Sequence, residues 1–177
     1  MMERQFTRHF ARCVSIDAPP GDVFSYLNRH ARLATHMTQA SWMMGGGRMD
    51  ISVDEGGGEK LGSHIRMSGK AFGISLFLDE VVTRYEPPVA KVWGTVNTLR
   101  LLVIGHYRMG FELVPQNAGS KLCVFIDYNL PESLGGRVLG FLLGRVYAKW
   151  CVNSMLRDAV EHFSFSGKAR MPTHVAS

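Results

Sequence analysis

The feature that most restricts how this chain can fold is a long apolar segment near its C-terminal end, from Pro131 to Phe165. Apolar residues recur there at helical spacing, which predicts one amphipathic helix. The predicted stripe has one polar break, Asn153, and consists of Val138, Leu142, Val146, Trp150, Leu156 and Val160. A helix of about 30 residues is about 45 Å long, more than the diameter of a small domain. We therefore expect it to lie across a single curved antiparallel sheet and to enclose a cavity with it.

Length and composition predict a single domain. The chain has 177 residues, of which 46% are hydrophobic, so it can bury a substantial core. We predict one domain over residues 1–166 and a flexible tail over residues 167–177. The first dozen residues lack the apolar run of a secretory signal. The apolar run Val138–Gly144 is bounded by Arg137 and Arg145, and it is far shorter than the ~20 residues that a membrane span needs.

Cysteine usage and charge argue against several classes of protein. Cys13, Cys123 and Cys151 are odd in number and far apart, so they predict neither a disulfide framework nor a zinc site. A reduced, cytoplasmic setting is the expectation that follows. The net charge of +5 is spread along the chain without a dense basic run, which argues against nucleic-acid binding. The histidines show no spacing typical of metal ligands, so we expect no metal and no cofactor.

The region before the long helix alternates between β-rich runs and turn residues, which predicts an antiparallel meander. A first strand is expected at Phe10–Ile16, followed by a short helix in residues 17–28 and a second one near residues 29–36. The further predicted strands are Arg48–Val53, His64–Ser68, Ile74–Tyr85, Val89–Val96, Gly105–Val114 and Lys121–Leu130. The fold class is therefore α+β, with a sheet of about six or seven strands.

Because side chains alternate between the two faces of a strand, parity predicts an inner face. Continuing the parity of the 74–85 strand places Glu80 inside, unless a bulge near Val81 reverses it. The orientations of Arg66 and Trp93 stay open, and Trp93 has the same parity as Lys91. The residues that parity places on the inner face are Ile74, Leu76, Leu78, Tyr107, Met109, Phe111, Leu113, Leu122, Val124, Ile126, Tyr128 and Leu130.

Three segments in this order resemble the START/Bet v 1-like (SRPBCC) superfamily. They are IDAPPGDVFSYLN at residues 16–28, DEVVTRYEPPVAKVWG at 79–94 and YRMGFELVPQNAGSKLCVFIDYNLP at 107–131. Among its branches, the bacterial polyketide cyclase/dehydrase-like group is the most similar. The resemblance covers roughly residues 6–165 and implies a helix-grip fold, in which a curved sheet is closed by the long helix. Members include lipid and sterol carriers, coenzyme-Q-binding proteins, plant hormone receptors and aromatase/cyclases, so the fold does not settle the function.

The leading hypothesis is that the chain binds or carries a hydrophobic small molecule, such as a lipid, an isoprenoid or a polyketide. Apolar walls would supply the affinity and a few polar groups would fix the orientation. The residues expected to line the site are Met67, Leu76, Leu78, Tyr107, Met109, Phe111, Ile126, Tyr128, Leu142, Val146 and Trp150.

Two alternatives stay open. By resemblance to aromatase/cyclases, the cavity would fold a reactive poly-β-ketone, with Glu80, Tyr107, Tyr128 or Arg66 transferring protons or stabilising an enolate. An acid/base pair converging inside the cavity would favour this enzyme, and a purely apolar lining would argue against it. The other alternative is a membrane-associated assembly helper that docks through an exposed stretch at Leu99–Val103. The sequence does not distinguish a monomer from a homodimer.

Overall fold

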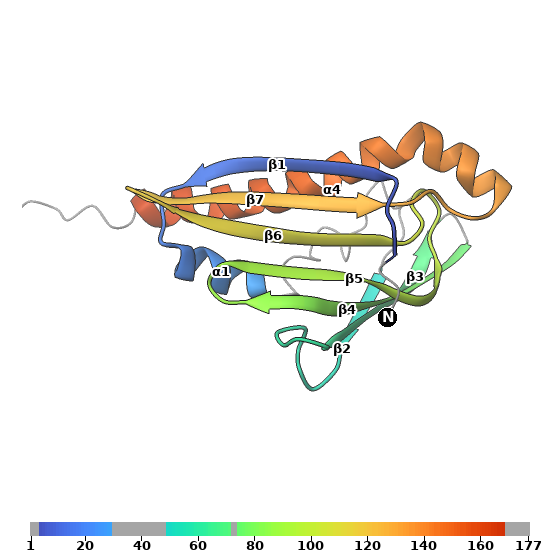
Figure 1. Ribbon diagram of the computed structural model, residues 1–177, viewed down its shortest axis with the longest axis horizontal. Coiled ribbons are helices and arrows are strands. Elements are labelled where there is room, and N and C mark those ends of the chain that lie inside the picture. Colours follow the sequence, from blue (N-terminus) through green and yellow to red (C-terminus); the bar gives the residue numbers. More distant parts are fainter. Residues whose placement is uncertain (1–3, 30–48, 72–73, 169–177) are drawn as a thin grey trace, which may run out of the picture.

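The computed structural model describes residues 4–29, 49–71 and 74–168. Within them, seven strands form one antiparallel sheet and two helices are described (Figure 1). The helices are α1 (Pro20–Asn28) and α4 (Leu134–Lys168). The strands are β1 (Arg8–Ile16), β2 (Met49–Val53), β3 (His64–Ala71), β4 (Ile74–Glu86), β5 (Ala90–Arg100), β6 (Tyr107–Gln116) and β7 (Gly119–Tyr128). The second short helix expected near residues 29–36 falls almost wholly in residues 30–48, outside the described residues.

The sheet confirms the predicted meander. Its strand order is β1-β7-β6-β5-β4-β3-β2, so the strands from β2 to β7 each pair with the next strand along the chain. The first strand is the exception, because β1 pairs with β7 at the far end of the sequence, with Arg8 opposite Tyr128. Both helices pack against this sheet, so the α+β class and the helix-grip arrangement are confirmed (Figure 1).

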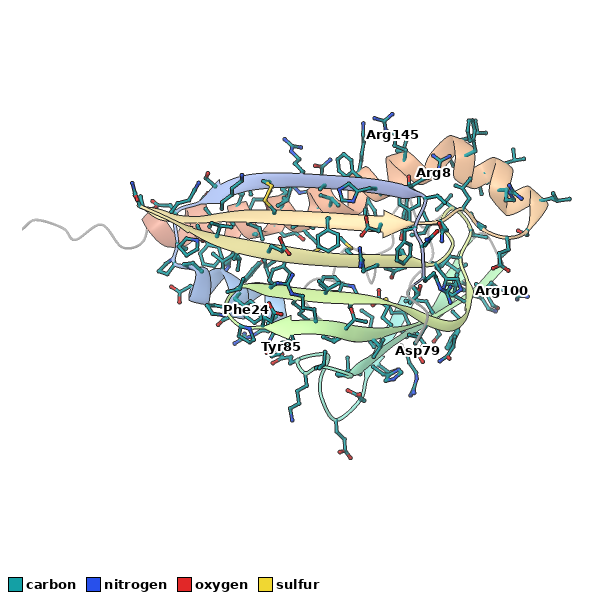
Figure 2. The ribbon with its side chains drawn as sticks, viewed as in Figure 1. Arg8, Phe24, Asp79, Tyr85, Arg100 and Arg145 are labelled. Atoms are coloured by element: carbon teal, nitrogen blue, oxygen red, sulfur yellow. A yellow bond between two sulfur atoms is a disulfide. The ribbon has the colours of Figure 1, made fainter. Side chains whose placement is uncertain are left out.

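Helix α1 lies within the predicted residues 17–28 but begins at Pro20, three residues after the predicted start. Pro20 stands at its first position, where its missing N–H costs no hydrogen bond. Val23, Phe24 and Leu27 form its buried stripe. The Phe24 ring meets Phe111 of β6 edge to face at 5.5 Å between ring centroids, and meets Tyr85 of β4 at 5.8 Å. Phe24 and Tyr85 lie together at one end of the molecule (Figure 2).

Helix α4 runs along the sheet and contacts β1, β7 and α1 (Figure 1). It is described to Lys168, two residues into the predicted tail. The second part of the helix is packed against the core, and its buried residues are Tyr147, Ala148, Cys151, Val152, Met155, Leu156 and Ala159. In the same view the first part of α4, drawn in orange, extends past the ends of β1 and β7.

The predicted apolar stripe of this helix is wrong over its first half. Leu142 and Val146 are 65% and 50% exposed, and Val138 is also exposed. The inward face is instead the glycine face. A Cβ built on Gly140 would lie 2.7 Å from the Val103 carbonyl oxygen, and one on Gly144 would lie 3.2 Å from the same atom. The glycines therefore turn inward because the β5–β6 loop passes too close for a side chain.

The sheet also corrects the prediction for two of the cysteines. Cys13 of β1 and Cys123 of β7 stand directly opposite each other and form a disulfide across 110 residues. Cys151 is a free, buried thiol. The pairing depends on which strands become neighbours, and cysteine spacing does not contain that information. The expected cytoplasmic location is no longer supported by the cysteines, and it stays a prediction.

Candidate functional site

The inner face of the sheet is an apolar surface that matches the predicted parity. All eight strand residues expected to line a ligand site are buried in one hydrophobic cluster with α1 and α4, namely Met67, Leu76, Leu78, Tyr107, Met109, Phe111, Ile126 and Tyr128. Ile74 is an exception to the predicted inner face, because it is 44% exposed at the start of β4. Whether these buried residues contact a ligand stays a prediction.

A carboxyl group lies inside this apolar cluster. Glu80 of β4 is 1% exposed, and its Oε1 accepts a hydrogen bond from the Tyr107 hydroxyl of β6. The pairing of β4 with β5 shifts register between Phe77 and Asp79 and again between Val82 and Arg84, yet Glu80 still points inward. Burial, reinforced by the nearby Glu80 carboxyl, raises the pKa of Tyr107 well above its ordinary value. Tyr107 therefore keeps its proton at neutral pH and can act as a donor inside the fold.

Helix α4 adds two further titratable groups to the same interior. Tyr147 and Cys151 are both buried and stand one helical turn apart on α4. Burial is the main cause that raises the pKa of Cys151 to about 12, and the Glu80 carboxyl contributes. Burial likewise raises the pKa of Tyr147 well above its ordinary value. Glu80 thus interacts with groups on both the sheet and the helix, which makes it the centre of the polar cluster.

A fully buried lysine lies on the same face of the sheet. Lys91 of β5 is 0% exposed, and its Nζ donates to the backbone oxygen of Asn28 at 3.0 Å and to its side-chain oxygen at 3.1 Å. The Nζ lies 5.9 Å from the centroid of the Trp93 ring. Asn28 is the last residue of α1, where an ammonium group also interacts favourably with the helix dipole. Lys91 therefore ties the end of α1 to the sheet.

The environment of Lys91 opposes its charge. Burial lowers its pKa to about 8, while the negative charges of Glu59 and Glu80 act in the opposite direction. A lysine in this range exchanges its proton near physiological pH, unlike an exposed lysine. The inner face thus carries an acid, a phenol and an amine among apolar side chains.

An open pocket of about 750 Å³ lies at the end of the sheet where β6 begins and β7 ends. Its wall includes His106, which directly precedes Tyr107, and Leu130, two residues after Tyr128. Arg4, Arg100 and Glu132 add charged groups to the rim. Arg100 lies at this end of the molecule in Figure 2. The volume is in the range that accommodates a drug-sized ligand.

Several predicted site residues are not brought together with this cluster. Arg66 faces outward, with a side chain 59% exposed and its Nε 3.7 Å from Asp79. Leu142 and Val146 are on the exposed side of α4, and Trp150 is half-buried beside Tyr147. The prediction of an exposed apolar docking loop is wrong. Its apolar residues are partly buried against the core, namely Leu99, Leu101, Leu102 and Val103.

Sequence reasoning missed Lys91, Asn28, Tyr147 and Cys151. The parity shared by Lys91 and Trp93 was a usable signal, because Trp93 proves to be 3% exposed and inward. A lysine in a strand is usually solvated, so parity alone did not predict that Lys91 is buried. Tyr147 and Cys151 share a face with Gly140 and Gly144, and that face was hidden by the apolar residues around the rest of the helix. Among the described residues, no group of three or more His, Cys, Asp or Glu side chains could hold a metal ion.

Comparison with solved structures assigns the fold to a class: it is the Bet v 1-like fold, which polyketide aromatase/cyclases also have. The di-domain ARO/CYC StfQ from the steffimycin biosynthetic pathway matches with a TM-score of 0.62 and 13% identity, over 90% of this chain and 51% of that chain. Ara h 8.0201 matches with a TM-score of 0.51 and 14% identity, over 85% and 98% of the two chains. TTHA0849 from Thermus thermophilus gives 0.63 and 14%, over 90% and 99%. No family model and no curated protein matches the sequence.

Proposed function

We propose that the protein binds or carries a hydrophobic small molecule, such as a lipid, an isoprenoid or a polyketide, between the sheet and helix α4. The single observation that carries the proposal is that the otherwise apolar inner face contains the Glu80–Tyr107 pair and a fully buried Lys91. Burying ionisable groups costs stability unless they are well paired, so their presence suggests a use beyond packing. Apolar walls with a few convergent polar groups are typical of small-molecule sites.

The orientation of the ligand follows from this arrangement. The apolar part would lie against Met109, Phe111 and Ile126, and a hydroxyl or carbonyl group would reach the Glu80–Tyr107 pair. The pocket beside His106 and Leu130 would be the way in, because it lies next to the strand ends that carry Tyr107 and Tyr128.

Mass spectrometry of the protein purified from its native host tests the proposal. We expect native spectra to show a bound small molecule that denaturing spectra release and identify. Glu80→Gln and Tyr107→Phe should lower its occupancy at least fivefold. Asp79→Asn is the matched control, because Asp79 is the next residue on β4 but faces outward, and it should leave occupancy unchanged. Equal occupancy in all four proteins would contradict the proposed site.

A second candidate function is an aromatase/cyclase-type enzyme, and one observation favours it. The inner face is not purely apolar, since Glu80 and Tyr107 form an acid–phenol pair and Lys91 has a pKa of about 8. An amine that gains and loses its proton near pH 8 suits general acid/base catalysis of an aldol cyclisation or dehydration, and a phenol that keeps its proton can donate to an enolate oxygen. Similarity in fold to a polyketide ARO/CYC is consistent with this candidate but does not assign it.

Poly-β-keto substrates separate the two candidates. An enzyme should convert them to cyclised products that chromatography with mass spectrometry resolves, and Glu80→Gln should lower the rate at least tenfold while Asp79→Asn does not. Tyr128→Phe tests the neighbouring phenol, which stands opposite Tyr107 in the β6–β7 register. A protein that binds these compounds without converting them would be a carrier.

A further inference from the structure

The first half of α4 presents an apolar face to solvent. Leu134 is 83% exposed, Phe141 is 66% exposed and Leu142 is 65% exposed. With Val138 they follow the spacing of one helix face, so their side chains adjoin one another. We call Leu134, Val138, Phe141, Leu142 and Val146 the α4 apolar face. Contiguous exposed apolar patches of this kind mark interaction sites rather than ordinary surface.

The same side of the helix is covered further along the chain. Val152 and Leu156 continue the line of Leu134 and Val138 at helical spacing, yet they are 0% and 3% exposed. The difference follows from the architecture, because the first turns of α4 extend past the ends of β1 and β7 (Figure 1). The α4 apolar face therefore starts on the part of the helix that extends past the sheet and continues to Phe141, which lies beside Arg8 of β1.

Between Leu134 and Arg157 the charged side chains of α4 have one sign. From Leu134 to Arg157 the sequence contains no Asp or Glu, but it contains Arg137, Arg145 and Lys149 as well as Arg157. All four of these side chains are exposed. From β1, the guanidinium of Arg8 lies 5.6 Å from the centroid of the Phe141 ring. Arg8 and Arg145 are both labelled on this side of the molecule in Figure 2.

We propose that the α4 apolar face, with Arg8, Arg137, Arg145 and Lys149 around it, docks the protein onto the surface of a membrane that contains anionic phospholipids. Leucine, valine and phenylalanine side chains enter the boundary between headgroups and acyl chains, while the cations meet the lipid phosphates. Helix α4 lies on the surface and does not cross it, since no helix in the described part of the chain is long and apolar enough to span a bilayer.

A bilayer suits this face better than a second copy of the chain does. In a twofold dimer the same patch would face itself, which would bring its cations against one another. An acidic surface satisfies the cations and buries the apolar side chains in one step. The docking surface is distinct from the proposed ligand site, so each can fail without the other.

Vesicle flotation with the full chain tests the docking surface. We expect the protein to float with vesicles of equal parts phosphatidylglycerol and phosphatidylcholine, and at least tenfold less with phosphatidylcholine alone. Leu142→Asp should lower binding to the acidic vesicles at least tenfold. The matched control is Leu61→Asp, because Leu61 is 68% exposed in the β2–β3 loop and the substitution has the same charge change. It should bind like the unaltered protein.

Arg145→Glu keeps the apolar side chains and reverses one cation, so it should weaken binding severalfold, most strongly at low salt. Circular dichroism of each variant establishes that it is folded. Three results would overturn the proposal: no preference for acidic vesicles, equal loss in Leu142→Asp and Leu61→Asp, or a lipid-free dimer by light scattering that Leu142→Asp dissociates. The last result would assign the face to self-association.

Discussion

Asp79 and Glu80 are consecutive residues of β4, both are buried carboxyls, and they meet opposite kinds of partner. Asp79 is 5% exposed and faces outward, where its oxygens lie 2.9 Å from His64 Nδ1 and 3.7 Å from Arg66 Nε. Glu80 is 1% exposed and faces inward, where the Tyr107 hydroxyl donates to it. One carboxyl is surrounded by basic side chains at the edge of solvent, and the other by apolar side chains and a phenol.

Burial alone therefore does not identify a functional carboxyl. A single step along a strand reverses the side chain, so the same backbone supplies both environments. Asp79 has partners that neutralise it and leave nothing for a ligand. Glu80 accepts a hydrogen bond from the Tyr107 hydroxyl, and the hydroxyl group of a ligand could take the place of that donor. Substitutions should therefore cost most stability in the interior and least on the solvated outer face.

Tyr107→Phe is expected to have the largest effect on stability. It removes the phenol that donates to Glu80 while keeping the ring, so the loss reports the hydrogen bond to a buried carboxyl. We expect the free energy of unfolding to fall by about 3 kcal/mol. Urea denaturation measures it, and the Glu80→Gln background isolates the pair, since there the same substitution should cost clearly less. A loss of about 1 kcal/mol or less, as expected for Asp79→Asn, would show that the Glu80 hydrogen bond is no stronger than the contacts of Asp79.

Lys91 should make stability depend on pH in the alkaline range. Its folded pKa of about 8 lies below the ordinary 10.5, so between these values the unfolded chain binds more protons. Stability therefore rises with pH in this window, and below pH 8 the cost of burying the charge is constant. Between about pH 8 and pH 10 we expect the unaltered protein to gain about 2 kcal/mol relative to Lys91→Met. If the free energy of unfolding changed with pH in the same way in both proteins, burial would not have lowered the pKa of Lys91.

Asp79→Asn should have a moderate effect. Its partners His64 and Arg66 have side chains 36% and 59% exposed, so water screens part of the interaction. We expect a loss of about 1 kcal/mol in chemical denaturation near neutral pH. Because the side chain faces outward, small-molecule occupancy should not change. A loss as large as that of Tyr107→Phe would remove the contrast between the two faces of β4.

Arg84→Ala should have the smallest effect, although its contacts are short. The guanidinium lies 2.7 Å from Glu86 and 2.8 Å from Glu112, and both carboxylates raise the pKa of Arg84. All three side chains are at least 41% exposed. Solvated ion pairs contribute little, so we expect the melting temperature to change by less than about 2 °C in calorimetry. A larger shift would show that the outer face contributes to the fold as strongly as the inner one.

The sequence predicted the sheet well because period-two patterns in β4, β6 and β7 are unambiguous. Parity predicted the inward Tyr107, and it predicted the inward Glu80 only if no bulge near Val81 reversed the strand. Helix α4 was harder, since apolar side chains surround its first half and suggest the wrong face. The small residues Gly140, Gly144 and Ala148 marked the buried side. The partnership of Lys91 with Asn28 and of Cys13 with Cys123 depends on which distant segments become neighbours, and no local pattern reveals that.

The pairing of the first strand with the last has a consequence for the order of events during synthesis. Strands β2 to β7 can join the sheet one hairpin at a time as each leaves the ribosome, because every new strand pairs with its predecessor. Strand β1 is made first but has no neighbour until β7 appears, and the partner of Cys13 is made 110 residues later. We expect the earliest strand to be among the last to pair, so the edge of β7 is the position where a nascent chain is most open to mispairing.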